Sequence, residues 1–355
     1  MKTRRARLHL GRSVPGRQTR RRRTSGGHVQ YNLSTEDYIH GGLQKDFYGQ
    51  DDVEACKCPL CDDFVPSTVV YRERGNLAVV RCDRCDLFYV NPRAKASSEN
   101  YHGDPAVYFE EARLIFAGKK AHHRDKNYEW EIREIQKLKP KGRLLDIGTN
   151  MGFFLRKCVE AGYAAEGVEP SPSLSKIARE QFGLTITNSY FEAAGFAKGS
   201  FDVITMIDVF EHVANPIELL GTARQVLADD GVLAIKVPNG NYNLLKQRIA
   251  ERTKREAQYD IWDSYEHIVH YTPETMEKMA KKGGFRVEKL LLPIPIHSPV
   301  WANMVGHYYQ YASPFWMDWK RITLRNLFYA AGRLEQAAQR SPHFAPDLMF
   351  MLKKA

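Results

Sequence analysis

The chain has 355 residues, 43% of them hydrophobic, which suits a soluble chain with one large domain and a smaller module. Its 52 Lys and Arg residues against 42 Asp and Glu give a net charge of +10. No apolar run is long enough to span a bilayer and no signal-peptide core is found near the N-terminus, so we expect a cytoplasmic protein without a membrane span.

The excess positive charge is confined to the first 23 residues, which contain ten Lys and Arg and no acid. The rest of the chain has 42 residues of each sign and is neutral. Residues 1–30 are too poor in apolar side chains to bury a core, which predicts a disordered basic tail. An RNA-binding or targeting arm is the alternative interpretation, because both can be Arg-rich and free of acids.

Four of the six cysteines form two Cys-x-x-Cys pairs separated by 20 residues. Each pair places two sulfurs on one tight turn, and two such turns complete a tetrahedral shell around zinc. Four thiolates close that shell, which predicts a structural zinc, whereas two disulfides would suit a secreted chain. The predicted ligands are Cys58, Cys61, Cys82 and Cys85, with Cys56 as an alternative to Cys58.

Apolar segments at 69–71 and 77–80 flank turn residues between the two cysteine pairs, which predicts a β-hairpin. An apolar run and then Asn91-Pro92-Arg93 follow the second pair. Residues 31–100 therefore resemble the N-terminal zinc-ribbon segment of a group of bacterial S-adenosylmethionine-dependent methyltransferases. Members of that group are associated with sugars, surface polysaccharides or other small metabolites.

Beyond this module, apolar residues recur at helical spacing over 105–139 and predict a helical connector at 101–140. From residue 141 onward, short apolar strands alternate with amphipathic helices. Strands are expected at 144–147, 164–168, 184–187, 201–207, 232–237, 285–292 and 348–352, and helices at 153–162, 171–182, 216–227 and 324–338. This alternation predicts an α/β fold with a Rossmann-like, doubly wound parallel sheet of seven strands over residues 141–355.

The first of these strands leads into a turn with two glycines, Gly148 and Gly152, and carries Asp146 near its tip. A carboxylate and glycines in a strand-to-helix turn suit a nucleotide or nucleoside lying against the backbone, although an ordinary turn is the alternative. Glu169 follows 23 residues after Asp146, at the tip of the second strand, where it is placed to accept hydrogen bonds from ribose hydroxyls.

The order of motifs from Asp146 to about Asn239 is similar to that of class I S-adenosylmethionine-dependent methyltransferases. The shared features include the glycine turn, the ribose acid, Phe201-Asp202 and Glu211-His212. A nicotinamide dehydrogenase would share only the first two. The resemblance implies S-adenosylmethionine as cofactor, its methionine end lined by Asp146, Gly148 and Gly152, its ribose held by Glu169 and its adenine bordered by Ser189 and Tyr190.

Two further positions belong to the expected cofactor site. Asn150 stands where the family more often has a glycine, and Asn tolerates a positive φ better than other non-glycine residues. Asp208 directly follows the fourth strand. We expect the loop to close around Asn150.

Three histidines are candidates for a general base, which methyl transfer needs only if the acceptor carries a proton at neutral pH. His212 follows the fourth strand, whereas His267 and His270 lie in a segment that, in the related enzymes, is close to the substrate pocket. A packing or hydrogen-bonding role is the alternative for each of them.

Two insertions, 240–272 and 293–346, are expected to lie on the substrate side or to form an oligomer face. The first is rich in Lys and Arg over 240–263, and the second contains a group of aromatic residues. Clustered aromatics favour a buried cap or a homo-oligomer face over a lid that stacks on a sugar or base. The group comprises Trp301, Tyr308, Tyr309, Tyr311, Phe315, Trp316 and Trp319.

Together these features predict a methyltransferase with a structural zinc that acts on a hydroxyl or amine of a small molecule or saccharide. An rRNA or tRNA methyltransferase guided by the zinc module and basic tail is a second hypothesis. The neutral body and the lack of an Asn/Asp-Pro-Pro-Tyr motif weigh against it. A third hypothesis, motivated by Asn150, is a non-catalytic zinc-containing binding protein on a degenerate methyltransferase fold.

Overall fold

The computed structural model of the chain describes residues 48–72, 77–95, 112–119, 121–122, 124–253, 261–295 and 315–355. The predicted basic tail and residues 101–111 of the predicted connector lie outside these ranges, as do Trp301, Tyr308, Tyr309 and Tyr311. The side chains of Phe315, Trp316 and Trp319 lie outside the described part as well.

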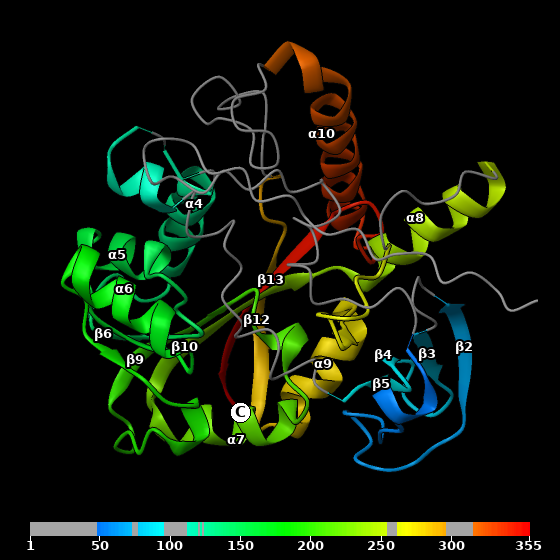
Figure 1. Cartoon of the computed structure of the whole chain (residues 1–355), viewed down its shortest axis with the longest axis horizontal. Coiled ribbons are helices and arrows are strands. Elements are labelled where there is room, and N and C mark those ends of the chain that lie inside the picture. Colours follow the sequence, from blue (N-terminus) through cyan, green and yellow to red (C-terminus); the bar gives the residue numbers. More distant parts are fainter. Residues whose placement is uncertain are drawn as a thin grey trace, which may run out of the picture. The chain divides into compact units, whose positions relative to one another are not determined.

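A seven-stranded sheet lies at the centre of the described fold, in the order β12-β13-β10-β9-β6-β7-β8 (Figure 1). Its strands are β6 (Arg143–Ile147), β7 (Ala164–Val168), β8 (Ile186–Thr187), β9 (Phe201–Ile207), β10 (Leu227–Pro238), β12 (Phe285–Leu291) and β13 (Asp347–Lys354). Strands β6 to β10 pair in parallel. The predicted α/β fold and its seven strands are confirmed.

The last strand departs from the predicted parallel sheet. β13 is antiparallel to both of its neighbours, β10 and β12. Its first residue, Asp347, pairs with Pro238 at the end of β10, so the chain enters β13 at the carboxyl edge of the sheet and has to run back across it. β10 also begins five residues earlier than expected, with a register shift between Leu227 and Val232.

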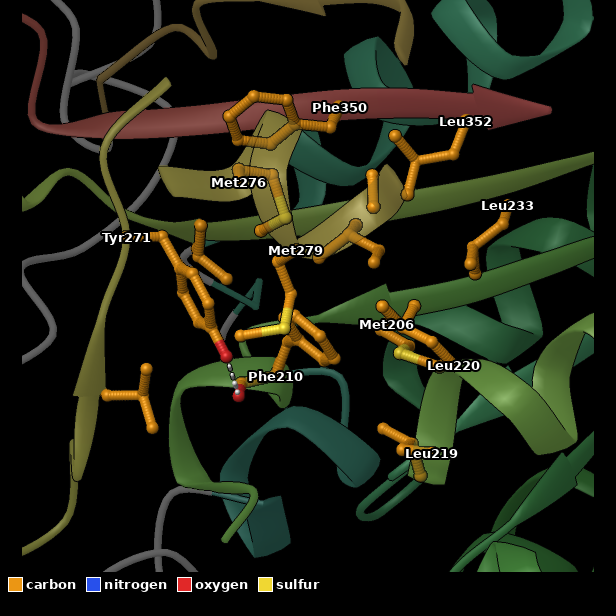
Figure 2. Close-up of a cluster of buried hydrophobic side chains, with 14 of the residues drawn as sticks. Met206, Phe210, Leu219, Leu220, Leu233, Tyr271, Met276, Met279, Phe350 and Leu352 are labelled. Carbon is orange, nitrogen blue, oxygen red and sulfur yellow. Dashed lines mark hydrogen bonds between the residues drawn. The ribbon is translucent and has the colours of Figure 1, made fainter. Parts of the chain in front are cut away.

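Helices cover both faces of this sheet. Successive residues of a strand point to opposite faces, so each face carries apolar side chains that a layer of helices can bury. Leu144 packs in the core beneath α4 (Asp125–Gln136), α5 (Phe153–Glu160) and α6 (Pro172–Phe182). Leu145 packs instead in the core shared with α7 (Pro216–Val226) and α9 (Pro273–Lys282). Figure 2 shows part of this second core, in which the Met276 and Met279 side chains of α9 meet the sheet.

Four helical segments fall where the connector and the two insertions are predicted. Residues 112–116 are helical and, with α4, account for the described part of the connector. α8 (Gly240–Thr253) follows β10, and α10 (Phe315–Ala337) precedes β13 and starts nine residues before the predicted helix. Among the described residues, no helix combines the length and apolar character that a bilayer-spanning segment needs.

The cysteine pairs lie on a second, four-stranded sheet with the order β11-β4-β3-β2. β2 (Ser67–Arg72) and β3 (Ala78–Cys82) form the predicted hairpin, and β4 (Phe88–Val90) pairs with β3. The fourth strand, β11 (Val269–His270), comes from far along the chain and pairs with β4. A short ladder between β1 (Val53–Glu54) and β5 (Arg93–Ala94) completes this part.

The two sheets share one hydrophobic core. Leu60, Leu87 and Tyr89 from the cysteine-bearing segment belong to the same buried cluster as Leu145 and Phe210 from the large sheet. The predicted domain boundaries near residues 100 and 140 stay predictions, but the described segments on either side of them are packed together.

Candidate cofactor, acceptor and metal sites

The turn between β6 and α5 contains three residues in the left-handed region: Gly148 with φ 68°, Asn150 with φ 52° and Gly152 with φ 83°. A Cβ on Gly148 would lie 2.7 Å from Val209 Cγ2, and one on Gly152 would lie 2.5 Å from Leu184 Cδ1. Both glycines are therefore required by backbone conformation and by close packing. The turn lies directly against the loop that follows β9.

Asn150 fits this turn through its own side chain. Its Oδ1 accepts a 2.7 Å hydrogen bond from the Met151 amide, and its backbone N–H donates to Glu169 Oε2 at 2.8 Å. The loop closes around a left-handed Asn, as the sequence predicted.

Two buried carboxyl groups flank the turn at the ends of adjacent strands. Asp146 accepts a 2.6 Å hydrogen bond from Thr205 Oγ1, and Glu169 Oε1 accepts one of 2.9 Å from the Ser171 amide. Burial raises the pKa of Asp146 to about 7, although the Thr205 hydrogen bond acts in the opposite direction. Burial also raises the pKa of Glu169, and its bonds to backbone amides partly offset this.

These carboxyl groups occupy the place where doubly wound sheets bind ligands. β6 lies between β7 and β9, so the direction of strand addition reverses between β6 and β9. Ligands bind such sheets at the carboxyl ends of the strands, beside the reversal. Two acids and a tight turn at this position suit a ligand that carries hydroxyl or ammonium donors.

Ser189 and Tyr190 follow β8. The Ser189 hydroxyl donates to the Tyr190 carbonyl at 2.9 Å, and the Tyr190 side chain is exposed. The neighbouring Asn188 donates to the carbonyl oxygen of Glu169 at 2.8 Å, which ties this segment to the end of β7. An exposed ring at this position is compatible with the predicted border of an adenine.

Asp208 is bound by cations of the chain itself. Its Oδ1 accepts from Lys236 Nζ at 2.6 Å, and its Oδ2 accepts from Arg124. Burial opposes ionisation of Asp208, but Arg124 and Lys236 hold its pKa below the usual range. The buried Glu131 lies 3.9 Å from Arg124.

The sequence analysis did not predict this cluster of buried charged residues, although Lys236 is an indication of it. It is a lysine inside an otherwise apolar strand, Leu233–Val237, and it is buried. Because a buried lysine needs a partner, its presence in such a strand predicts a carboxylate nearby.

The structure brings two of the three candidate histidines together. His212 lies in a short 3-10 helix, Phe210–His212, and the centroid of its ring is 4.9 Å from that of His267. His270 lies on β11 instead, buried with its ring edge against Trp262. Burial lowers the pKa of His267 to about 4 and that of His270 well below its ordinary value, so both imidazoles are neutral at pH 7.

Glu211 completes the group formed by His212 and His267. A carboxylate oxygen of Glu211 and one ring nitrogen of each histidine all lie within 4.8 Å of one another. Burial raises the pKa of Glu211 well above its ordinary value, and the charge of Asp208 adds to this effect. The sequence marked Glu211-His212 as a motif but assigned no role to the carboxyl group.

Backbone contacts hold the two segments of this group in place. The Ile268 amide donates to the Glu211 carbonyl at 3.0 Å. Beneath them, the rings of Phe210 and Tyr271 stack with centroids 5.0 Å apart, and the Tyr271 hydroxyl donates to the Phe210 carbonyl (Figure 2). The position of the carboxyl and imidazole groups is thus set by a packed core.

The four predicted cysteine ligands form one cluster. Their sulfurs all lie within 4.8 Å of one another, with 3.5 Å between Cys58 and Cys85 and 3.7 Å between Cys61 and Cys82. None of them forms a disulfide. Tetrahedral zinc with Zn–S bonds of 2.3 Å requires sulfurs about 3.8 Å apart, so the cluster fits a closed zinc shell.

Cys56, the alternative ligand, lies outside this cluster. Its Sγ donates to the Val90 carbonyl at 3.3 Å. Two lysines of α9 contact the cysteine turns: Lys278 donates to the Cys85 carbonyl at 2.9 Å and Lys282 to the Leu60 carbonyl at 2.8 Å. The zinc-binding turns are therefore attached directly to the helix that covers the large sheet.

Residues 121–290 match a family model described as a methyltransferase domain. The chain is 35% identical over 149 residues to a ubiquinone biosynthesis O-methyltransferase of Cereibacter sphaeroides. The matched region covers 40% of this chain and 59% of that protein. A protein of the same name from Actinobacillus pleuropneumoniae is 24% identical over 195 residues, and the match covers 50% of this chain and 74% of that protein. The chain thus spans less than two thirds of the length of the first of these relatives.

Among solved structures, a SAM-dependent methyltransferase from Archaeoglobus fulgidus is similar with a TM-score of 0.44. It is 20% identical to the chain, and the match covers 70% of this chain and 100% of that one.

Proposed function

We propose that this chain, residues 121–290 of which match a methyltransferase domain, depends on S-adenosylmethionine and transfers its methyl group to a hydroxyl of a small molecule. One observation supports this most directly: the turn that carries Gly148 packs against Val209, three residues before His212. The cofactor turn and the Glu211–His212–His267 group therefore lie next to each other at one edge of the sheet. The hydroxyl acceptor is supported by the relatives named O-methyltransferases.

The residues around the turn fit the cofactor by their chemistry. Each oxygen of Glu169 accepts one backbone N–H, and a carboxylate oxygen has room for a second donor, so ribose hydroxyls can be added without breaking either bond. Asp146 offers a carboxylate for the methionine end. When bound, the cofactor supplies an electrophilic methyl group on a sulfonium.

The work of the chain is to align the acceptor with that methyl group and to exclude water. His212 and His267 lie beside the cofactor turn, and a neutral imidazole nitrogen can accept a hydrogen bond from an acceptor hydroxyl and orient it. His270, buried against Trp262, would act through packing. The hydroxyls of a saccharide belong to the same class of acceptor.

Calorimetry with S-adenosylmethionine on folded, zinc-loaded protein tests the first half of the proposal. We expect one equivalent of cofactor to bind. If folded, zinc-containing protein binds no cofactor, both methyltransferase hypotheses are contradicted and a non-catalytic binding protein is favoured.

Incubation with methyl-labelled cofactor tests the acceptor class, with hydroxylated small molecules compared against RNA. Label is expected in the small-molecule fraction, also after deletion of residues 1–27. Transfer of label to RNA by the truncated protein would contradict the small-molecule proposal.

Replacing Asn150 by glycine tests whether the Asn side chain has a role in the cofactor turn. Glycine adopts a φ near 52° without strain, and we expect the affinity for S-adenosylmethionine to stay within about threefold of wild type or to rise. The control is Asn150→Val, whose β-branched side chain is strained at positive φ and should weaken binding. A large loss in the glycine variant would show that the Asn side chain contacts the cofactor.

A further inference from the structure

One side of α10 turns apolar side chains toward solvent. Leu324, Leu327 and Leu334 are 51%, 61% and 72% exposed, and Ala338 is exposed as well. A helix at the surface of a folded chain normally carries charged and polar residues on its outer side. An exposed row of leucines on such a helix therefore indicates a surface that another molecule covers.

The apolar residues of this side have the spacing through which two helices pair. Leu324, Leu327, Ala331, Leu334 and Ala338 follow one another in alternate steps of three and four residues. Such steps place side chains in one line along a helix, as at the a and d positions of a coiled coil. We call these five residues the α10 seam.

The α10 seam consists of leucine and alanine only and carries no charge. Arg325 and Arg333 are exposed, but each lies one residue, or about 100° around the helix, from a seam leucine. Glu335 is engaged by its own chain, because its Oε2 accepts from the backbone amides of His343 and Phe344 at 2.7 and 3.1 Å. A charge-free seam offers little to select an acidic or basic partner, and it does not repel a second copy of itself.

The opposite side of α10 is packed against the rest of the chain. Gln336 Nε2 donates to the Leu290 carbonyl at 2.9 Å, which attaches the helix to β12. A Cβ on Gly332 would lie 2.8 Å from the Ala345 amide nitrogen, so the helix also touches the segment before β13. These contacts fix α10 in place and leave the seam available to a further molecule.

The sizes of the seam residues favour two antiparallel copies. In a parallel pair each seam residue would meet its own copy, and Ala331 opposite Ala331 would leave an underfilled layer. In an antiparallel pair, Leu327 meets Ala331 of the second copy and Leu324 meets Leu334, so each of these layers contains a leucine. Such a contact is self-complementary, because a twofold axis repeats each pair of residues on its other side.

We propose that two copies of this chain associate through the α10 seam, with their α10 helices antiparallel about a twofold axis. The proposal is independent of the methyltransferase reaction, because the seam contains no residue of the cofactor, acceptor or metal sites. A seam of about four turns buries less than a standard interface of about 800 Å² per partner, so we expect a dimer that dissociates in the micromolar range.

Sedimentation velocity of the full-length, zinc-loaded protein tests the dimer over concentrations from about 1 to about 200 µM. We expect the mean mass to rise from that of one chain toward that of two. Leu327→Glu places a charge in a central layer of the pair, where it loses water without gaining a partner. This variant should associate at least about tenfold more weakly.

The matched control is Val159→Glu. It makes the same kind of change at an apolar side chain of α5 that is 44% exposed and lies outside the seam. The control should associate as wild type does. An unchanged thermal transition shows that each variant is folded.

A charge-swap experiment tests the antiparallel register. Ala331→Lys alone should also weaken association, because it brings a lysine into the same layer. An equal mixture of the Leu327→Glu and Ala331→Lys proteins should recover association, since the introduced glutamate then faces the introduced lysine. The second central layer of that mixed pair keeps its native leucine and alanine. A substitution that only disturbs the fold would not be rescued in this way.

Three results would contradict the proposal. Wild-type protein that keeps the mass of one chain throughout, or a folded Leu327→Glu variant that associates normally, would overturn the dimer. A mixture that associates no better than its two components would overturn the antiparallel register. Monomeric wild-type protein that sediments with phosphatidylglycerol vesicles, and loses this property in Leu327→Glu, would assign the seam to a lipid surface instead.

Discussion

Cys82→Ser will lose its zinc and, with it, the order of the four-stranded sheet. Cys82 is fully buried, its Sγ lies 3.7 Å from that of Cys61, and its amide donates to the Leu87 carbonyl at 2.9 Å. Structural zinc binding is worth about 10–16 kcal/mol in small zinc-binding peptides, comparable to the whole stability of a domain. We expect less than half an equivalent of zinc by elemental analysis and a thermal transition lowered on the order of 10 °C.

The loss should extend to strand β11 along its pairing with β4, while the flanking Ile268 and Tyr271 stay bonded to Glu211 and Gly240 beside the large sheet. Hydrogen exchange at Val90, whose amide donates to the Ile268 carbonyl, should become faster in the variant. The control is Cys56→Ser, which removes a thiol outside the cluster and should keep its zinc. A Cys82→Ser protein with one full zinc and an unchanged transition would disprove the four-sulfur shell.

Asp146→Asn is expected to weaken S-adenosylmethionine binding about 10- to 100-fold, because a hydrogen bond to a charged group is worth about 1.5–3 kcal/mol. The variant keeps an oxygen that can accept from Thr205, so the local packing should be maintained. Calorimetry at pH 8 measures the loss. In the wild type, affinity should fall as the pH drops through about 7, where Asp146 becomes protonated. An Asn variant that binds cofactor normally would remove Asp146 from the site.

The same substitution should stabilise the protein without cofactor. The pKa of Asp146 rises from 3.8 to about 7 on folding, so between these values the folded state holds a proton that the unfolded state has released. Its contribution to stability therefore falls as the pH rises from about 4 to about 7, by up to about 4 kcal/mol. At pH 8 the Asn variant should melt higher than wild type. The control is Asp229→Asn, an exposed carboxylate paired with Lys354.

Local patterns in the sequence predicted most of the fold. β7 and β9 have the expected bounds, and α6 begins at Pro172 and ends before a left-handed Gly183. Such segments depend on apolar periodicity and on turn residues that are close together in the sequence. The burial of Cys158 in the core under α5 follows from the same periodicity.

What the sequence did not predict depends on contacts between distant segments. Arg124 and Asp208 are 84 residues apart, and neither residue has a local pattern that identifies its partner. His267 and His270 belong to one motif, but pairing of β11 with β4 buries His270 and leaves His267 beside His212. Cys56 and Cys58 were distinguished only by the positions of their sulfurs.

The pairing of β4 with β11 also has a consequence for the growing chain. Tyr89 is opposite Val269, so the ribosome has to add about 180 residues after β4 before its partner strand exists. At about 5–20 residues per second this takes roughly 10–40 s. The cysteine turns can close around zinc during this time, but the outer edge of β4 stays unpaired, and such edges promote aggregation. Protection of this strand edge during translation should therefore raise the yield of folded protein, in addition to the supply of zinc.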